Sequence, residues 1–151
     1  MHLLIINTDK SYSENLKYSL ETMGHELDIS CDQASGEELF QASKHEMVLI
    51  GHEPGQIDSL GLLKKFRAIN PDLRVVISWP QADVRFVCEA VHERVFDFFT
   101  EKIDFRFLIL LLDETEQRIK VESERKEQHS RLAMGYARLK QAYNDLQERL
   151  K

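Results

Sequence analysis

The sequence predicts an α/β domain in which five parallel strands are covered by helices on both faces of the sheet. Short apolar runs alternate with amphipathic stretches through the first hundred residues. The runs are mostly continuous in their apolar character, which is typical of strands buried on both faces. The stretches between them are long enough for crossover helices, so five such units imply a parallel, doubly wound sheet.

The first units can be placed from spacing and capping residues. We expect a strand over residues 3–7 and a helix over 11–24, whose apolar side chains recur at intervals of four and three. Gly24 can end this helix because glycine tolerates a left-handed C-cap. A weaker strand follows over 26–30. The next helix is predicted to begin with Ser35 as its N-cap, because a glutamate three residues later completes a capping box.

The remaining elements follow the same alternation. We predict strands over 47–50, 73–78 and 95–99, and helices over 58–69 and 83–93. Proline at position 71 prevents the first of these helices from continuing. The second gathers its apolar side chains on one face, at Val84, Val87, Cys88 and Val91.

Composition excludes several classes of protein. The 151 residues carry a net charge of −6, whereas a nucleic-acid module needs a basic patch. No apolar run approaches the roughly 20 residues that span a bilayer, and the start of the chain lacks the features of a signal peptide. Cys31 and Cys88 are far apart, which favours reduced core thiols in a cytoplasmic protein. The six histidines show no metal-binding spacing, so we expect no metal and no cofactor.

Polar residues stand where the predicted strands end. In parallel sheets of this kind, ligands bind at the carboxyl ends of the strands. The residues at these strand tips are Asn7, Thr8, Asp9, Gly51, Ser78, Thr100 and Glu101.

At these residues the chain resembles the receiver domain of two-component response regulators. The resemblance rests on the order of the elements and on phrases such as LLIINTDKSYSENLKYSLETMGHEL and VFDFFTEKID. Asn7 and Gly51 are 44 positions apart, the separation that the family uses between its acidic pair and its phosphoacceptor aspartate. The resemblance implies the flavodoxin-like strand order 2-1-3-4-5.

The resemblance also implies that the phosphorylation site is degenerate. The family's acidic pair, which helps to hold Mg²⁺, falls on the neutral Asn7 and Thr8. The phosphoacceptor position is Gly51, which has no nucleophile, and the conserved lysine position is Glu101, which would repel a phosphoryl group. Ser78 fits the family's Ser/Thr position. The switch-aromatic position is Phe96, and a glycine usual before it is replaced by Arg94. We therefore expect a pseudo-receiver that is not an enzyme and is not phosphorylated on aspartate.

Neighbouring residues leave a second reading open. Asp9 could hold a cation, although we favour a role as a helix cap. Lys102 is expected to point away from the position of Glu101 if the chain is extended there. His52 follows Gly51 directly and could accept a phosphoryl group. A receiver switched by unconventional phosphorylation or by a ligand is therefore the alternative.

A flavodoxin-like cofactor domain is a further, weaker alternative. Thr8, Ser11 and Ser13 supply hydroxyl groups after the first strand, but no glycine lets the backbone approach a phosphate closely. An enzyme built on Ser78 is weaker still. His52 is its candidate base and has no third residue to orient it.

The end of the chain predicts one long helix over residues 104–150. Its last part has a heptad seam formed by Leu132, Tyr136, Leu139, Tyr143, Leu146 and Leu150. We expect a receiver-like domain over 1–112 and a dimerisation helix over 113–151 that forms a parallel homodimeric coiled coil. A helix that folds back on its own domain is the alternative. The expected whole is the regulatory N-terminal part of a longer signalling protein, with an unknown protein partner or fused output domain and no nucleic-acid or membrane partner.

Overall fold

The computed structural model describes residues 1–151 and contains one five-stranded sheet. Its order is β2-β1-β3-β4-β5, and every neighbouring pair is parallel. The strands are β1 (His2–Ile6), β2 (Glu26–Ser30), β3 (Met47–Gly51), β4 (Arg74–Ser78) and β5 (Asp97–Phe99). The predicted fold class and strand order are thereby confirmed.

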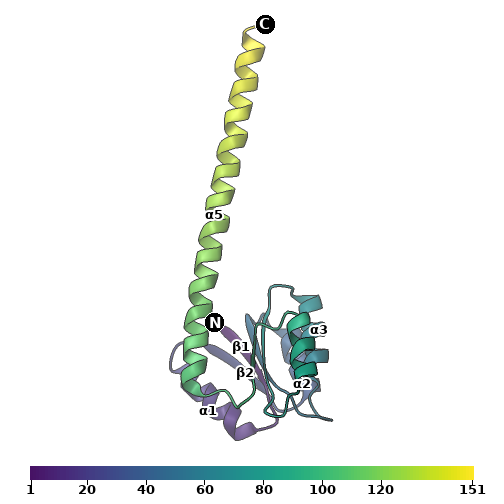
Figure 1. Ribbon diagram of the computed structural model, residues 1–151. Coiled ribbons are helices and arrows are strands. Elements are labelled where there is room, and N and C mark those ends of the chain that lie inside the picture. The colour runs from purple at the N-terminus through teal and green to yellow at the C-terminus, as the bar shows by residue number, and fades with distance from the viewer. The chain divides into compact units, whose positions relative to one another are not determined.

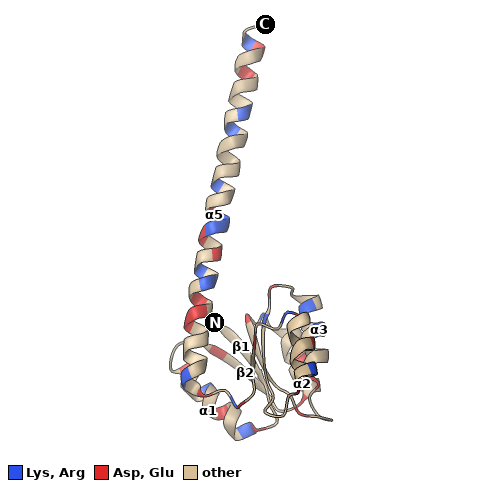
Figure 2. Cartoon of the chain, in the orientation of Figure 1, with Lys and Arg blue, Asp and Glu red and all other residues tan.

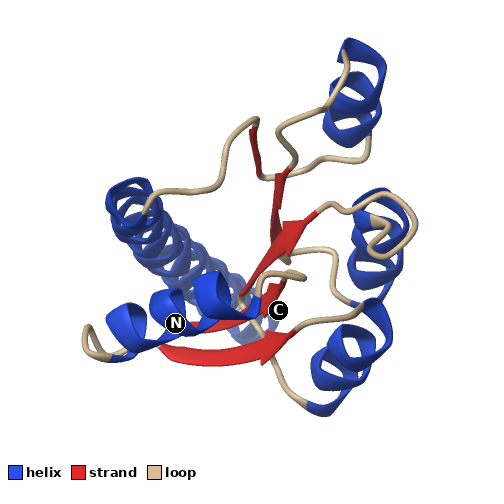
Figure 3. Ribbon diagram, turned by 90° about the horizontal axis from the view of Figure 1, so that it is seen from below, coloured by secondary structure: helices blue, strands red, loops and turns tan.

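Helices cover both faces of this sheet. They are α1 (Lys10–Glu21), α2 (Gln33–Ala42), α3 (Ser59–Ile69) and α4 (Val84–His92). Helix α1 lies on one face, and α2 and α3 lie on the other (Figure 1; Figure 3 gives the view from below). Because all five strands run in the same direction, their carboxyl ends meet along a single edge of the sheet.

An aspartate caps each of these four helices. Its side chain accepts a hydrogen bond from the backbone N–H group three residues later, which satisfies a donor that the helix itself leaves unpaired. The caps are Asp9, Asp32, Asp58 and Asp83. The predicted cap of α2 is therefore wrong: Ser35 donates its N–H group to Asp32, and the helix begins before it. Aspartate outcompetes serine here because its carboxylate is the stronger acceptor.

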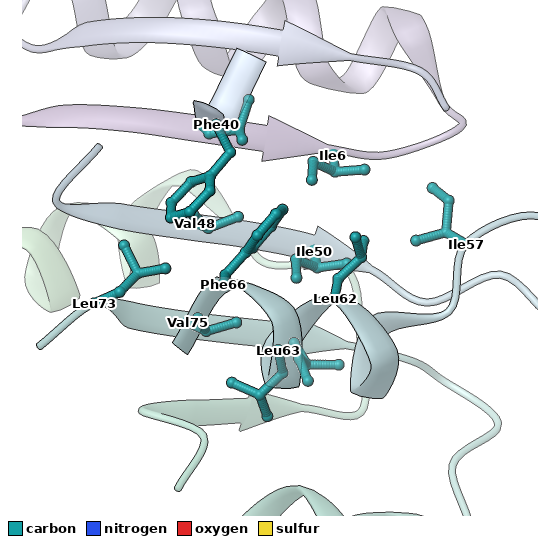
Figure 4. Close-up of a cluster of buried hydrophobic side chains, with 12 residues drawn as sticks. Ile6, Phe40, Val48, Ile50, Ile57, Leu62, Leu63, Phe66, Leu73 and Val75 are labelled. Atoms are coloured by element: carbon teal, nitrogen blue, oxygen red, sulfur yellow. The ribbon is translucent and has the colours of Figure 1, made fainter. Parts of the chain in front are cut away.

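The core between the sheet and helices α2 and α3 is apolar. The rings of Phe40 and Phe66 stack with centroids 4.1 Å apart and point toward the strands (Figure 4). Leu62 and Leu63 of α3 are also fully buried. Burying side chains of this size contributes roughly 1.5–3 kcal/mol each, so this layer holds α2 and α3 on the sheet.

Helix α4 lies within the predicted helix and carries the predicted apolar side chains. Its apolar face is largely uncovered, since Val84 is 79% and Val91 is 64% exposed and only Ala90 is buried. Cys88 and Cys31 are free, as predicted, but both are exposed and not in the core. Periodicity identified an apolar face correctly, but it carries no information on whether another element covers that face.

The helix ends also differ in their backbone geometry. Gly24 follows α1 with a φ of 88°, the left-handed conformation expected of a glycine C-cap. Arg94 follows α4 with a φ of 61°, in which a side chain with a Cβ is strained. The structure therefore keeps the turn that favours glycine and places an arginine in it.

Helix α5 (Phe105–Arg149) is continuous over 45 residues, or about 68 Å at 1.5 Å per residue. Contacts along the chain divide it into two units, Met1–Phe105 and Arg106–Lys151. The predicted boundary after residue 112 stays a prediction. No helix is long and apolar enough to cross a membrane. Acidic and basic side chains are interspersed along α5 (Figure 2).

Candidate functional site

The carboxyl edge of the sheet brings the predicted strand-tip residues together. Asn7 follows β1, and its backbone N–H group bonds to the carbonyl oxygen of Ser30 at 3.0 Å. Gly51 and Ser78 end β3 and β4 and are register partners. The N–H group of His52 continues this ladder to the carbonyl oxygen of Ser78 at 2.9 Å. The strands thus place Asn7, Gly51 and Ser78 at one edge of the sheet.

The side chain of Asn7 occupies the space above Gly51. A Cβ atom added to Gly51 would lie 2.6 Å from Asn7 Nδ2, which is closer than side chains tolerate, and 3.0 Å from Asn7 Cγ, which is a tight contact. Asn7 is held in this place because its Oδ1 accepts a hydrogen bond from the Asp9 N–H group at 2.9 Å. The Asn7 side chain therefore fills the space that a side chain at position 51 would occupy.

The carboxylate of Asp9 is already neutralised by a side chain from across the site. Lys102 Nζ lies 2.6 Å from Asp9 Oδ2, although the two residues are 93 positions apart. The hydrogen bond from Lys102 and the Tyr12 N–H group hold the pKa of Asp9 below its usual range. Asp9 is the predicted helix cap as well. Lys102 was expected to point away from the site only if the chain is extended there, and this condition is not met, because residues 100–104 are irregular.

This donor set does not fit the Mg²⁺ ion that the receiver resemblance implies. Mg²⁺ is held through carboxylate oxygens and water. Asn7 and Thr8 are neutral, and the Asp9 carboxylate is engaged by an ammonium group. A divalent cation at Asp9 would have to displace Lys102 or share the carboxylate with it. We therefore derive no step through a metal at this edge.

The other predicted site residues are spread over the edge or lie away from it. Thr8 and Glu101 are exposed. Phe96 precedes β5 and so stands at the opposite end of that strand from the strand tips. Its N–H group bonds to the Val75 carbonyl oxygen at 2.8 Å, and the Arg74 guanidinium carbon is 6.0 Å from its ring centroid. Phe96 thus packs locally and is not part of the pocket.

An aromatic cluster that the sequence did not predict, formed by His52, Trp79 and Phe86, lies next to Gly51. The His52 ring lies 4.4 Å from Trp79 and 4.7 Å from Phe86 between centroids, and Trp79 and Phe86 meet edge to face. His52 Nδ1 accepts from the Ser59 N–H group at 3.3 Å and lies 2.8 Å from Ser59 Oγ. Burial lowers the pKa of His52, which favours a neutral ring. His52 is therefore a packed, hydrogen-bonded residue.

A half-buried tyrosine, Tyr12, lies next to Asp9, which accepts its backbone N–H group. The Tyr12 hydroxyl group donates to the Ile103 carbonyl oxygen at 2.8 Å, and burial raises the pKa of Tyr12 to about 12. Lys102 Nζ lies 5.4 Å from the ring centroid. These contacts hold the segment that carries Lys102 over the start of α1.

In the second unit, the predicted seam of α5 is a row of exposed apolar side chains. The six seam residues are between 58% and 81% exposed. Tyr143 accepts a hydrogen bond from Gln147, and Arg131 pairs with Glu127 at 2.7 Å, so the contacts between them are those of a surface helix. Nothing within this unit buries the seam.

Comparison with known proteins supports the fold. No protein-family model matches the sequence, and no curated protein matches it either. Solved structures do match. A receiver domain protein from Methanospirillum hungatei superposes with a TM-score of 0.74 at 16% identity, covering 80% of this chain and 97% of its own. The signal receiver domain of an HD-domain-containing protein from Pseudomonas fluorescens gives 0.70 at 18% identity, covering 82% and 92%.

A third structure was solved in a phosphorylated state. It is a response regulator from Burkholderia pseudomallei with a phosphorylated aspartic acid, a calcium ion and citrate, and it gives a TM-score of 0.67 at 17% identity, covering 81% of this chain and 72% of its own. The chain therefore has the fold of response-regulator receiver domains.

Proposed function

We propose that this chain is a receiver-fold signalling module that is not phosphorylated on aspartate and acts through protein contacts. The observation that carries the proposal is the Asn7–Gly51 pair. Position 51 offers no carboxylate, and the amide of Asn7 fills the space that a side chain there would need. A phosphoacceptor could not be regained by a change at position 51 unless Asn7 also moved.

The charge arrangement at the same edge supports this proposal. Lys102 neutralises Asp9, the acidic residue nearest the family's acidic pair. Glu101, at the position of the family's lysine, would repel a phosphoryl group. The chain thus combines a receiver fold with a pocket in which Lys102 is the counter-ion of Asp9. Signalling would then depend on partners and not on a bound phosphoryl group.

Treatment with acetyl phosphate and Mg²⁺ tests the proposal directly. We expect the intact mass of the folded chain to stay unchanged, while a phosphorylatable receiver domain treated in parallel gains about 80 Da for one phosphoryl group. An adduct on the wild-type chain that persists in a His52→Gln variant would refute the proposal. An adduct that His52→Gln abolishes would instead establish the alternative, in which His52, in the aromatic cluster beside Gly51, is phosphorylated.

We further propose that α5 pairs with a second copy of itself as a parallel coiled coil. Six exposed apolar side chains at alternating steps of four and three match the seam of a two-stranded coiled coil. A symmetric pair would bury twelve such side chains. The interspersed charges along α5 leave no block of like charge to oppose pairing (Figure 2).

The dimeric helix suggests where the signal would go. We propose that the chain is the regulatory part of a longer two-component-type protein, with α5 leading to an output domain or partner. The P. fluorescens receiver is, by its description, part of an HD-domain-containing protein, which gives one example of this fold joined to another domain.

A further inference from the structure

A cluster of metal-ligating side chains lies away from the carboxyl edge. His2 opens β1, Asp28 stands in β2, and His45 lies between α2 and β3. One ligand atom from each lies within 4.8 Å of the other two. His2 begins the first strand, so the cluster lies toward the amino ends of the strands and is separate from the Asn7–Gly51 pocket.

The two histidines converge on a single oxygen atom. Nε2 of His2 lies 2.9 Å and Nε2 of His45 lies 2.8 Å from the same Asp28 Oδ2. Their rings are 4.3 Å apart between centroids. Two imidazole nitrogens and one carboxylate oxygen lying within 4.8 Å of one another are ligands that Zn²⁺ and neighbouring divalent transition metals prefer.

The surroundings hold these ligands in place and leave a path for an ion. The His45 side chain is fully buried and stacks on Phe40, with centroids 6.1 Å apart. His2 and Asp28 remain partly exposed, at 24% and 32% of their side-chain area, so an ion can enter from solvent. The Glu46 carboxylate is close by as well, because it accepts the His2 backbone N–H group at 2.9 Å.

We propose that His2, Asp28 and His45 form a binding site for one divalent transition-metal ion, with water at the open position. With about 2.0–2.2 Å from each ligand atom to the ion, tetrahedral ligands stand about 3.3–3.6 Å apart, so the present hydrogen bonds need to open by roughly 0.4–0.8 Å. An ion there would link β1, β2 and the segment that enters β3.

One atom limits the affinity of this site. His45 Nδ1 is buried and has no hydrogen-bond partner. When Nε2 binds a metal, Nδ1 carries the hydrogen, and the usual second-shell acceptor for it is missing here. We therefore expect binding roughly 10–100-fold weaker than at a site whose outer shell is complete.

Titration of the full, untagged chain with Co²⁺ and Zn²⁺ tests the proposal. We expect one equivalent of Co²⁺ per chain, with the visible absorption of a four-coordinate ion, and displacement by Zn²⁺. His2→Gln and Asp28→Asn should each weaken binding about tenfold or more. His92→Gln, which alters an exposed histidine outside the cluster, is the matched control and should leave the affinity unchanged.

Circular dichroism establishes that each variant is folded, and two independent variants keep the test valid if one of them is not. The proposal is overturned if the wild-type chain shows no saturable binding, since the cluster would then be a hydrogen-bonded triad without a metal. It is also overturned if His2→Gln and Asp28→Asn bind as tightly as the wild type, because the ion would then lie elsewhere.

Discussion

Replacing Gly51 by alanine should destabilise the protein, although a Gly→Ala substitution at a position with open space around it stabilises a folded protein. The Cβ atom of a Gly51→Ala variant meets Asn7 Nδ2 at 2.6 Å and Asn7 Cγ at 3.0 Å. Either the site is overpacked, at about 1–3 kcal/mol, or Asn7 rotates and loses its bond to the Asp9 N–H group, at about 1 kcal/mol. The reduced entropy of the unfolded chain returns about 0.4–1 kcal/mol. Because the cheaper of these two responses sets the cost, we expect a net loss of up to about 0.6 kcal/mol.

The effect of Gly51→Ala on stability should change sign when Asn7 is also replaced by alanine. In an Asn7→Ala background, the nearest remaining atom of residue 7 is its Cβ, 3.6 Å from the new methyl group, which is ordinary contact. Gly51→Ala should then stabilise the protein by about 0.5 kcal/mol, so the two substitutions are coupled by about 1 kcal/mol, the cost of the contact with Asn7.

Urea unfolding of the four proteins at equal concentration measures this coupling. Fluorescence of Trp79, the one tryptophan in the chain, reports on the first unit. Asn70→Ala supplies the control background, because Asn70 lies in the turn before β4 and Gly51→Ala should remain destabilising there. Additive effects of Asn7→Ala and Gly51→Ala would refute the claim that the Asn7 amide fills the position above Gly51.

Three further predictions concern charge, pH and backbone. Lys102→Met should raise the pKa of Asp9 toward its usual value, as followed by carboxyl NMR titration; an unchanged Asp9 pKa would mean that the ion pair does not form in solution. Burial lowers the pKa of His52 in the folded chain. As the pH falls, His52 is therefore protonated in the unfolded chain before it is protonated in the folded chain. The folded state thus loses stability as the pH drops below the unfolded pKa of about 6.5. Urea unfolding at pH 7.5 and 5.5 should show a smaller fall for His52→Gln, and an equal fall would exclude this contribution. Arg94→Gly should stabilise the chain by up to about 1 kcal/mol, since it relieves the left-handed φ of 61°, whereas Arg94→Ala keeps that strain and should not.

The sequence predicts those parts of this fold that depend on local pattern. Continuous apolar runs located the strands, and Asp9 caps the start of α1 as the sequence predicts. The end of α1 was placed too late, because the helix stops at Glu21 with Thr22 as its C-cap, and Gly24 supplies the left-handed turn two residues later. The strand tips followed because parallel strands end on one edge. The start of α2 was misplaced because Asp32 and Ser35 both satisfy the local capping rule, and the choice depends on which acceptor is stronger.

Contacts between distant residues could not be predicted in this way. Lys102 and Asp9 are 93 positions apart, and the irregular segment that carries Lys102 has no periodicity to give its direction. His2, Asp28 and His45 come from three elements with no shared spacing, so no histidine motif reveals them. Spacing can find a metal site on one helix or loop, whereas this cluster exists only once β1 and β2 are paired.

Sedimentation velocity of the full chain, with and without acetyl phosphate and Mg²⁺, tests most directly whether the module acts through its helix without phosphorylation. We expect a dimer in both conditions. Leu139 is 71% exposed, and burying that fraction contributes about 1.5 kcal/mol in each of two copies, so Leu139→Glu should weaken the dimer about 100-fold or more. Gln141→Glu, on the opposite side of the helix, should have no such effect. A wild-type chain that is monomeric, or that dimerises only after acetyl phosphate is added, would contradict the proposed mechanism.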